Sequence, residues 1–186
     1  MPLNKPTILA MMIALIVGTN YLMFALPNIK LMDMLVFLTG LWLGPMYGAA
    51  AGFMSWLVYG TVNPLGFNLV TLATVAPMEM IYGVLGGLIA GRVSRTVPGM
   101  AWMFGLVALF ATLAYDLVTN AVTGLLFYSG AYYGHVYFPS WAVGVVAGIG
   151  FSLAHILSNF MMFTVLAPVL VVESNRAFFR RMGKLV

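Results

Sequence analysis

The stretch that decides the fold is LMDMLVFLTGLWLGPMYGAAAGFMSWLVY, residues 31–59, which carries a single formal charge. An unbroken apolar run of this length would cross a bilayer as one helix, because about 20 apolar residues span the hydrocarbon core. The run is broken at Gly44 and Pro45, where proline removes a backbone donor and clashes with the preceding turn. We therefore predict two short helices, at about residues 31–43 and 46–60.

The scarcity of charge extends over the whole chain. Of 186 residues, eight are Lys or Arg and four are Asp or Glu, so charged residues make up 6%, against about 25% in soluble domains. Hydrophobic residues make up 63%, and the mean hydropathy is +1.04. So few charges cannot cover a water-exposed surface. This composition excludes a soluble enzyme, a disordered chain and a nucleic-acid-binding protein.

The apolar runs do not alternate with polar residues as the strands of a membrane barrel do, so the spans are expected to be helices. The sequence predicts an all-α polytopic membrane protein, a six-helix bundle in a single domain over residues 1–186. The four helices outside the central run are expected at about residues 7–26, 68–90, 100–127 and 141–171, with an aromatic loop at 128–140 and a basic tail at 172–186.

Six crossings place both termini on one side of the membrane. Seven basic residues then face the cytoplasm and only Lys30 lies outside, as the positive-inside rule favours. If residues 31–59 formed a single span and the amino terminus lay outside, seven basic residues would again face the cytoplasm, with Lys30 inside and Lys5 outside. The Gly-Pro break therefore decides between the two topologies. The seven residues are Lys5, Arg92, Arg95, Arg176, Arg180, Arg181 and Lys184.

Small residues recur at every fourth position on three of the predicted helices. Such spacing lets helices approach closely in lipid, where packing drives association. For each of these stripes, packing within the bundle and contact with a separate membrane protein both remain open. The stripes are Ala10, Ala14 and Gly18; Gly44, Gly48 and Gly52; and Gly83, Gly87 and Gly91.

Three titratable side chains, Glu79, Asp116 and His155, fall deep within predicted spans. Each lies about 16 to 21 Å below the outer end of its helix at 1.5 Å per residue, so the three share one layer. Ionisable groups in the bilayer are costly and mark functional sites by default. A structural role, pinning neighbouring helices or satisfying freed backbone groups, is the alternative for each.

Other polar residues continue from this layer toward the outer face, as a stripe of Thr112, Asp116, Asn120 and Thr123 and a second stripe of Ser152, His155 and Asn159. Residues three and four apart share one helix face, so we expect a polar cleft that opens outward. The candidate substrate-binding residues are Asn20, Asn68, Glu79, Asp116, Asn120, His155 and Asn159.

No catalytic residue, metal site or cofactor is expected. The chain has no cysteine and no H-x-x-x-H spacing, which excludes thiolate chemistry and the usual helical metal motif. Ser152 and His155 lie on the same helix without an independent base. The sequence also contains no G-x-x-x-x-G-K-[ST] loop, so any ATP must be used by another chain.

Four segments form an ordered set over nearly the whole chain: Ala10-x-x-x-Ala14, Leu35–Gly48, Pro77-Met-Glu79 with Tyr82-Gly83, and Asp116-Leu-Val-Thr-Asn120. With six helices and a basic tail, this set resembles the substrate-binding S component of energy-coupling factor (ECF) transporters. The resemblance implies capture of a small water-soluble vitamin or related micronutrient at the cytoplasmic (plasma) membrane. It also implies delivery with a transmembrane coupling subunit, contacted by Ala10 and Ala14, and two ATPase subunits.

The expected ligand is neutral or cationic, because no Lys or Arg lies within the predicted spans to pair an anion. Thiamin-like, cobalamin-like and deazapurine-precursor ligands would all fit this chemistry. The alternative function is a self-sufficient secondary transporter of a small solute, in which Glu79 or Asp116 serves as the proton site.

Overall fold

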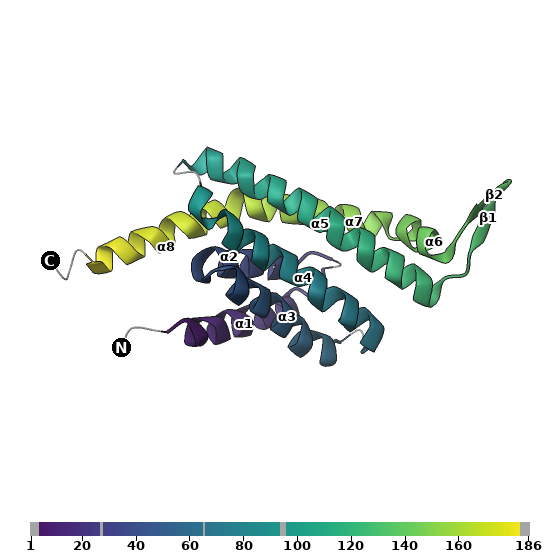
Figure 1. Cartoon of the computed structure of the whole chain (residues 1–186), viewed down its shortest axis with the longest axis horizontal. Helices are drawn as coiled ribbons and strands as arrows, with labels where there is room; N and C mark the ends of the chain where they lie inside the picture. The colour runs from purple at the N-terminus through teal and green to yellow at the C-terminus, as the bar shows by residue number, and fades with distance from the viewer. Residues whose placement is uncertain (1–3, 27, 65, 94–95, 183–186) are drawn as a thin grey trace.

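A computed structural model describes residues 4–26, 28–64, 66–93 and 96–182, with side chains up to Ser174. Almost all of this part of the chain is helical (Figure 1). The helices are α1 (Lys5–Leu22), α2 (Met32–Leu43), α3 (Pro45–Thr61), α4 (Leu69–Ile89), η1 (Ala90–Arg92, a 3-10 turn), α5 (Val97–Phe127), α6 (Ser140–Ala147), α7 (Ile149–Met161), η2 (Met162–Leu166, a π-helical turn) and α8 (Ala167–Met182), and the strands are β1 (Ala131–Tyr133) and β2 (Val136–Phe138).

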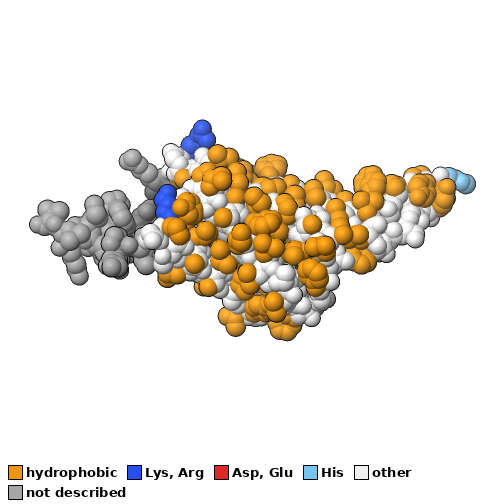
Figure 2. Space-filling view, turned by 60° about the horizontal axis from the view of Figure 1, so that its bottom comes forward, with side chains coloured by type: hydrophobic (Ala, Val, Ile, Leu, Met, Phe, Trp, Pro, Cys, Tyr) orange, Lys and Arg blue, Asp and Glu red, His pale blue; other side chains and the backbone are white. Residues whose placement is uncertain are grey.

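Four helical segments in the described residues are long and apolar enough to cross a membrane: Lys5–Leu22, Leu69–Arg92, Val97–Phe127 and Ile149–Ser174. Hydrophobic side chains cover most of the face seen in Figure 2, with Lys and Arg toward one end. The same end holds the start of α1 and the end of α8 in Figure 1. The chain is therefore a helical, membrane-embedded protein.

The central apolar run is divided as the Gly44-Pro45 step predicts. α2 ends at Leu43, Gly44 has a φ of 105°, and α3 begins at Pro45. Only glycine adopts such a φ without strain, and proline at the first helical position loses no hydrogen bond. α2 has only 12 residues, ten of them buried, because α1, α3, α4 and α8 surround it. A helix that is apolar all round is typical of such a buried position.

The segment expected as one helix over residues 141–171 is instead built from several pieces. A break at Gly148 separates α6 from α7, η2 follows, and α8 continues the helix into the predicted tail as far as Met182. Of the basic residues assigned to one side, Arg95 and Lys184 lie outside the described residues, as do the side chains of Arg176, Arg180 and Arg181.

The predicted aromatic loop at residues 128–140 contains a β-hairpin. β1 pairs antiparallel with β2, and the rings of Tyr132 and Tyr137 lie 5.0 Å apart across it. Gly134 has a φ of 64°, which suits the tight turn of a hairpin. The 31 residues of α5 rise about 46 Å, so α5 outreaches the other helices and carries the hairpin at its far end (Figure 1).

Two glycine stripes pack inside the bundle through Gly48, Gly52, Gly83 and Gly87, whereas a Cβ at Gly44 or Gly91 would meet nothing within 4 Å. Gly48 on α3 and Gly83 on α4 lie backbone to backbone, and a Cβ on either would overlap the other's main chain. Gly87 lies against the backbone of Pro45 in the same way. This close approach holds α2, α3 and α4 as one unit and gives these stripes an internal role.

The stripe on α1 differs, because Ala10 and Ala14 are exposed and a Cβ at Gly18 would meet nothing within 4 Å. In the described part of the chain, no helix covers this small-residue face. The alternative of contact with a separate membrane protein therefore stays open for α1.

Replacing Gly83 with alanine should destabilise the protein by about 1–3 kcal/mol, because the added methyl group has no room against Gly48. Gly18→Ala, at the same kind of helical position with open space around it, should leave stability unchanged or raise it by up to about 1 kcal/mol. Thermal unfolding in detergent measures both. Equal melting temperatures for the two variants would contradict the packing described for α3 and α4.

Candidate functional site

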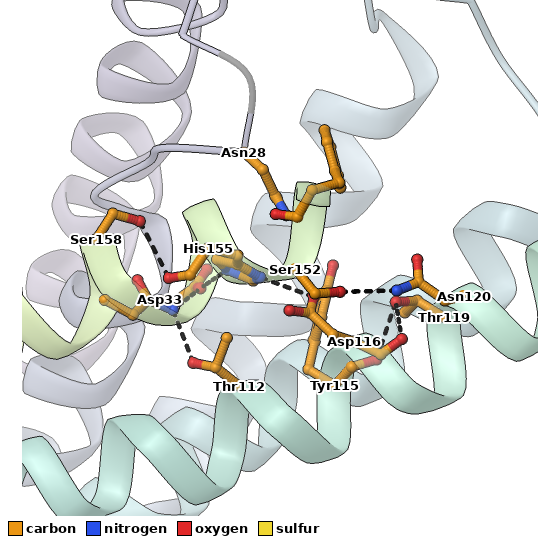
Figure 3. Close-up of polar contacts among 12 residues, drawn as sticks. Asn28, Asp33, Thr112, Tyr115, Asp116, Thr119, Asn120, Ser152, His155 and Ser158 are labelled. Atoms are coloured by element: carbon orange, nitrogen blue, oxygen red, sulfur yellow. Dashed lines mark hydrogen bonds and ion pairs between the residues drawn. The ribbon is translucent and has the colours of Figure 1, made fainter. Parts of the chain in front are cut away.

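The two polar stripes predicted on α5 and α7 face one another and pair in three successive rungs (Figure 3). Asn120 Nδ2 donates to Ser152 Oγ at 2.8 Å. His155 Nδ1 lies 2.8 Å from Asp116 Oδ1, and Asn159 Nδ2 donates to Thr112 Oγ1 at 2.9 Å. The spacings of four on α5 and of three and four on α7 keep each stripe on one face, so the two stripes can pair along their length where α5 and α7 pack together.

The middle rung extends to a third helix through Asp33. Its Oδ2 lies 2.5 Å from His155 Nε2 and accepts a hydrogen bond from Asn159 Nδ2 at 2.6 Å. His155 thus lies between two carboxylates, one from α2 and one from α5, and is fully buried with Asp33. Charges removed from water are tolerated when paired and hydrogen-bonded, and this bridge joins α2, α5 and α7.

Lys30 and Glu79 continue the charged cluster on the other side of Asp33. Lys30 Nζ lies 3.2 Å from Asp33 Oδ1 and 3.9 Å from Glu79 Oε2, and Trp56 Nε1 donates to the same Glu79 oxygen at 3.1 Å. Burial alone would lower the pKa of Lys30, but the charges of Asp33 and Glu79 raise it above its usual value. Lys30 therefore stays protonated.

A cavity of about 400 Å³ lies over this cluster. It is partly open and within the size range of small-molecule sites. Its walls come from the end of α1, the α1–α2 connection, α3, the start of α4, the second half of α5 and the start of α7, so the cavity lies away from the end where α1 begins and α8 ends. Apolar and aromatic side chains, among them Phe24, Ile29, Trp56, Tyr59, Val75, Tyr115 and Phe151, make up much of the lining.

The predicted site residues divide into three groups. Asn20, Asp116 and Asn120 line the cavity. Glu79, His155 and Asn159 are buried in the network beneath it and do not line it. Asn68 lies apart from both, because its Oδ1 caps α4 by accepting from the Thr71 backbone N–H at 2.9 Å.

Two charged residues that were not among the predicted site residues, Lys30 and Asp33, belong to the site. Asp33 is fully buried in the first turn of α2, and Lys30 lines the cavity with 13% of its side chain exposed. The sequence signal that could have indicated this is the spacing of three residues between Lys30 and Asp33 at the edge of an apolar run, which allows the two side chains to pair. Trp56 and Tyr115 were also missed, since aromatic residues in an apolar helix carry no pattern of their own.

Lys30 also corrects one premise about the ligand. The expectation of a neutral or cationic ligand rested on the absence of a basic residue from the spans, yet a lysine lies in the cavity wall. Asp33 already holds that lysine, so the charge of the ligand depends on the balance of the whole cluster.

Within residues 4–26, 28–64, 66–93 and 96–182, no group of three or more His, Cys, Asp or Glu side chains has the geometry to hold a metal ion. Comparison with protein-family models finds no match, and comparisons with curated proteins and with solved structures find no significant similarity.

Replacing His155 with alanine should destabilise the protein by about 3–5 kcal/mol, because two buried carboxylates would lose the group that bridges them. His135→Ala, in the exposed turn of the hairpin, is the matched control and should leave stability unchanged. Thermal or denaturant unfolding in detergent compares the two. A melting temperature for His155→Ala equal to that of the wild type would show that the bridge does not hold the bundle together.

Proposed function

We propose that this chain is the substrate-binding S component of an ECF-type transporter, a non-catalytic subunit that captures a small water-soluble vitamin or related micronutrient. The observation that carries the proposal is an open cavity of about 400 Å³ with apolar walls over a buried polar cluster. Such a combination is typical of a small-molecule site. A chain without an ATP-binding loop needs a separate subunit to drive uptake with ATP.

The proposed topology has six crossings, with both termini in the cytoplasm of a cell whose cytoplasmic membrane holds the protein. The four long apolar helices would be joined by α2 and α3, which are short because the Gly44-Pro45 step divides the central apolar run. Lys5 lies in α1 and Arg92 in η1, and the start of α1 and η1 both lie toward the end opposite the hairpin in Figure 1. Basic residues at that end favour a cytoplasmic location, and the cavity would then open outward.

The exposed small-residue face of α1, at Ala10 and Ala14, is the proposed contact for the transmembrane coupling subunit. Small side chains let a second helix approach closely, and no described helix of this chain occupies that face. The coupling subunit would in turn carry the two ATPase subunits. This assignment rests on the resemblance of the sequence together with the exposure of the face.

Replacing Ala14 with tryptophan should abolish co-purification with the coupling subunit and its ATPases, because the bulky ring would hold the two helices apart. The isolated variant should keep the melting temperature of the wild type, since the ring would point away from the bundle. Leu113→Trp, at an exposed position of α5, should leave co-purification unchanged. A fall in the stability of the isolated Ala14→Trp chain would instead assign the face to internal packing.

A secondary transporter is the second candidate, favoured by the buried chain of protonatable groups Asp33, His155 and Asp116. Such chains can carry protons in transporters. Uptake by proteoliposomes from an external mixture of water-soluble metabolites distinguishes the two functions. We expect accumulation, read by mass spectrometry, only with the coupling module and ATP. Accumulation by this chain alone, driven by a pH gradient, would contradict the proposal and favour the secondary transporter.

A further inference from the structure

Two residues that line the cavity carry buried acceptor atoms that lack hydrogen-bond partners. Asn20 Oδ1 and Asp116 Oδ2 belong to lining residues and have no partner among the described residues. Both residues are at least nine-tenths buried, with 4% and 5% of their surface exposed. Buried acceptors are costly when left unpaired, so a ligand that donates hydrogen bonds to them would be favoured.

Several donors on the same walls are committed within the protein. Trp56 Nε1 donates to Glu79 at 3.1 Å, and Asn120 Nδ2 donates to Ser152 at 2.8 Å. The hydroxyls of Thr74, Thr119 and Thr123 donate to carbonyls of their own helices at 2.8–2.9 Å. The threonine oxygens therefore offer a ligand lone pairs rather than protons.

Asp116 keeps one carboxylate oxygen that the cluster does not use. The ring nitrogens of His155 face Asp33 Oδ2 and Asp116 Oδ1, and Lys30 Nζ lies 3.2 Å from Asp33. Asp116 Oδ2 has no partner among the described residues. The acceptor that remains on this lining residue is therefore a carboxylate oxygen, which binds a charged donor more strongly than a neutral one.

The same wall already holds an organic cation, the ammonium group of Lys30. Its Nζ lies 5.1 Å from the centroid of the Trp56 ring and 4.9 Å from that of Tyr115, and 3.2 Å from Asp33. Aromatic faces attract cations, and a nearby carboxylate strengthens the attraction. The lining thus provides the two features that recognise a protonated amine, ring faces and acidic oxygens.

We propose that the ligand of this cavity is a small organic monocation, an apolar body that carries a protonated amine or another N–H cation, with its charge directed to Asp116 and Asn20. The inference rests on the proposed capture function and names its substrate class. An anion would lie beside the carboxylate of Asp116, since Lys30 is already held by Asp33.

Three probes of one shape test the charge preference on the purified wild-type chain in detergent. They are 2-phenylethylammonium, 2-phenylethanol and phenylacetate, which share a ring and differ in charge. Calorimetry or the rise in melting temperature gives the affinity of each. We expect the cation to bind at least about tenfold more tightly than the alcohol, because charge-assisted hydrogen bonds are the stronger ones, and phenylacetate to bind most weakly.

The variant Asp116→Asn removes the charge and keeps the shape and an oxygen for His155. It should weaken binding of 2-phenylethylammonium at least about tenfold and leave the affinity for 2-phenylethanol little changed. Glu173→Gln, which removes an exposed acid of α8 that does not line the cavity, is the matched control and should bind all three probes as the wild type does.

Equal affinities for the three probes, or tighter binding of phenylacetate, would overturn the charge assignment and leave the capture function in place. Absence of saturable binding of every probe at millimolar concentrations would overturn it as well. The comparison of probes uses the wild-type chain, so it stands even if Asp116→Asn does not fold. Failure of the capture function is read separately in the proteoliposomes, where uptake is measured for solutes of any charge.

Discussion

The bridge of His155 between Asp33 and Asp116 is the interaction on which the rest of the arrangement depends. It joins α2, α5 and α7 through contacts of 2.5 and 2.8 Å, at full or nearly full burial. A membrane interior offers no water to such groups, so each needs its partner in place. The two flanking rungs, Asn120 with Ser152 and Asn159 with Thr112, fix α5 against α7 on either side of the bridge.

Glycine packing brings a third acid, Glu79, to the same place. Because Gly48 and Gly83 let α3 and α4 approach backbone to backbone, Trp56 reaches Glu79 across that interface. The buried α2 then presents Asp33 toward α7, and Lys30 at its entry closes the cluster. The cavity lies above this assembly, so the features that stabilise the bundle also give the cavity its polar floor. The proposed capture function uses that floor and leaves energy supply to other subunits.

The features that could be predicted from the sequence follow mostly from the helical repeat and from helix-breaking residues. The stripes on α5 and α7 were predicted to be polar faces, and the Gly44-Pro45 step divides the central run, because both depend only on local geometry. Asp33 was missed because its burial comes from long-range packing of α2, and the hairpin was missed because its strands have only three residues each. Asn68 shows the reverse case, a polar residue used locally as a helix cap.

The central claim is that a solute cavity over this network opens on the membrane face away from the chain ends. The sequence has no cysteine, so single cysteines can be labelled without further changes. In right-side-out vesicles, we predict that an external membrane-impermeant maleimide labels Thr119→Cys in the cavity wall and spares Thr39→Cys, which is fully buried in α2. Failure to label Thr119→Cys from outside, or labelling only from the cytoplasmic side, would contradict the account.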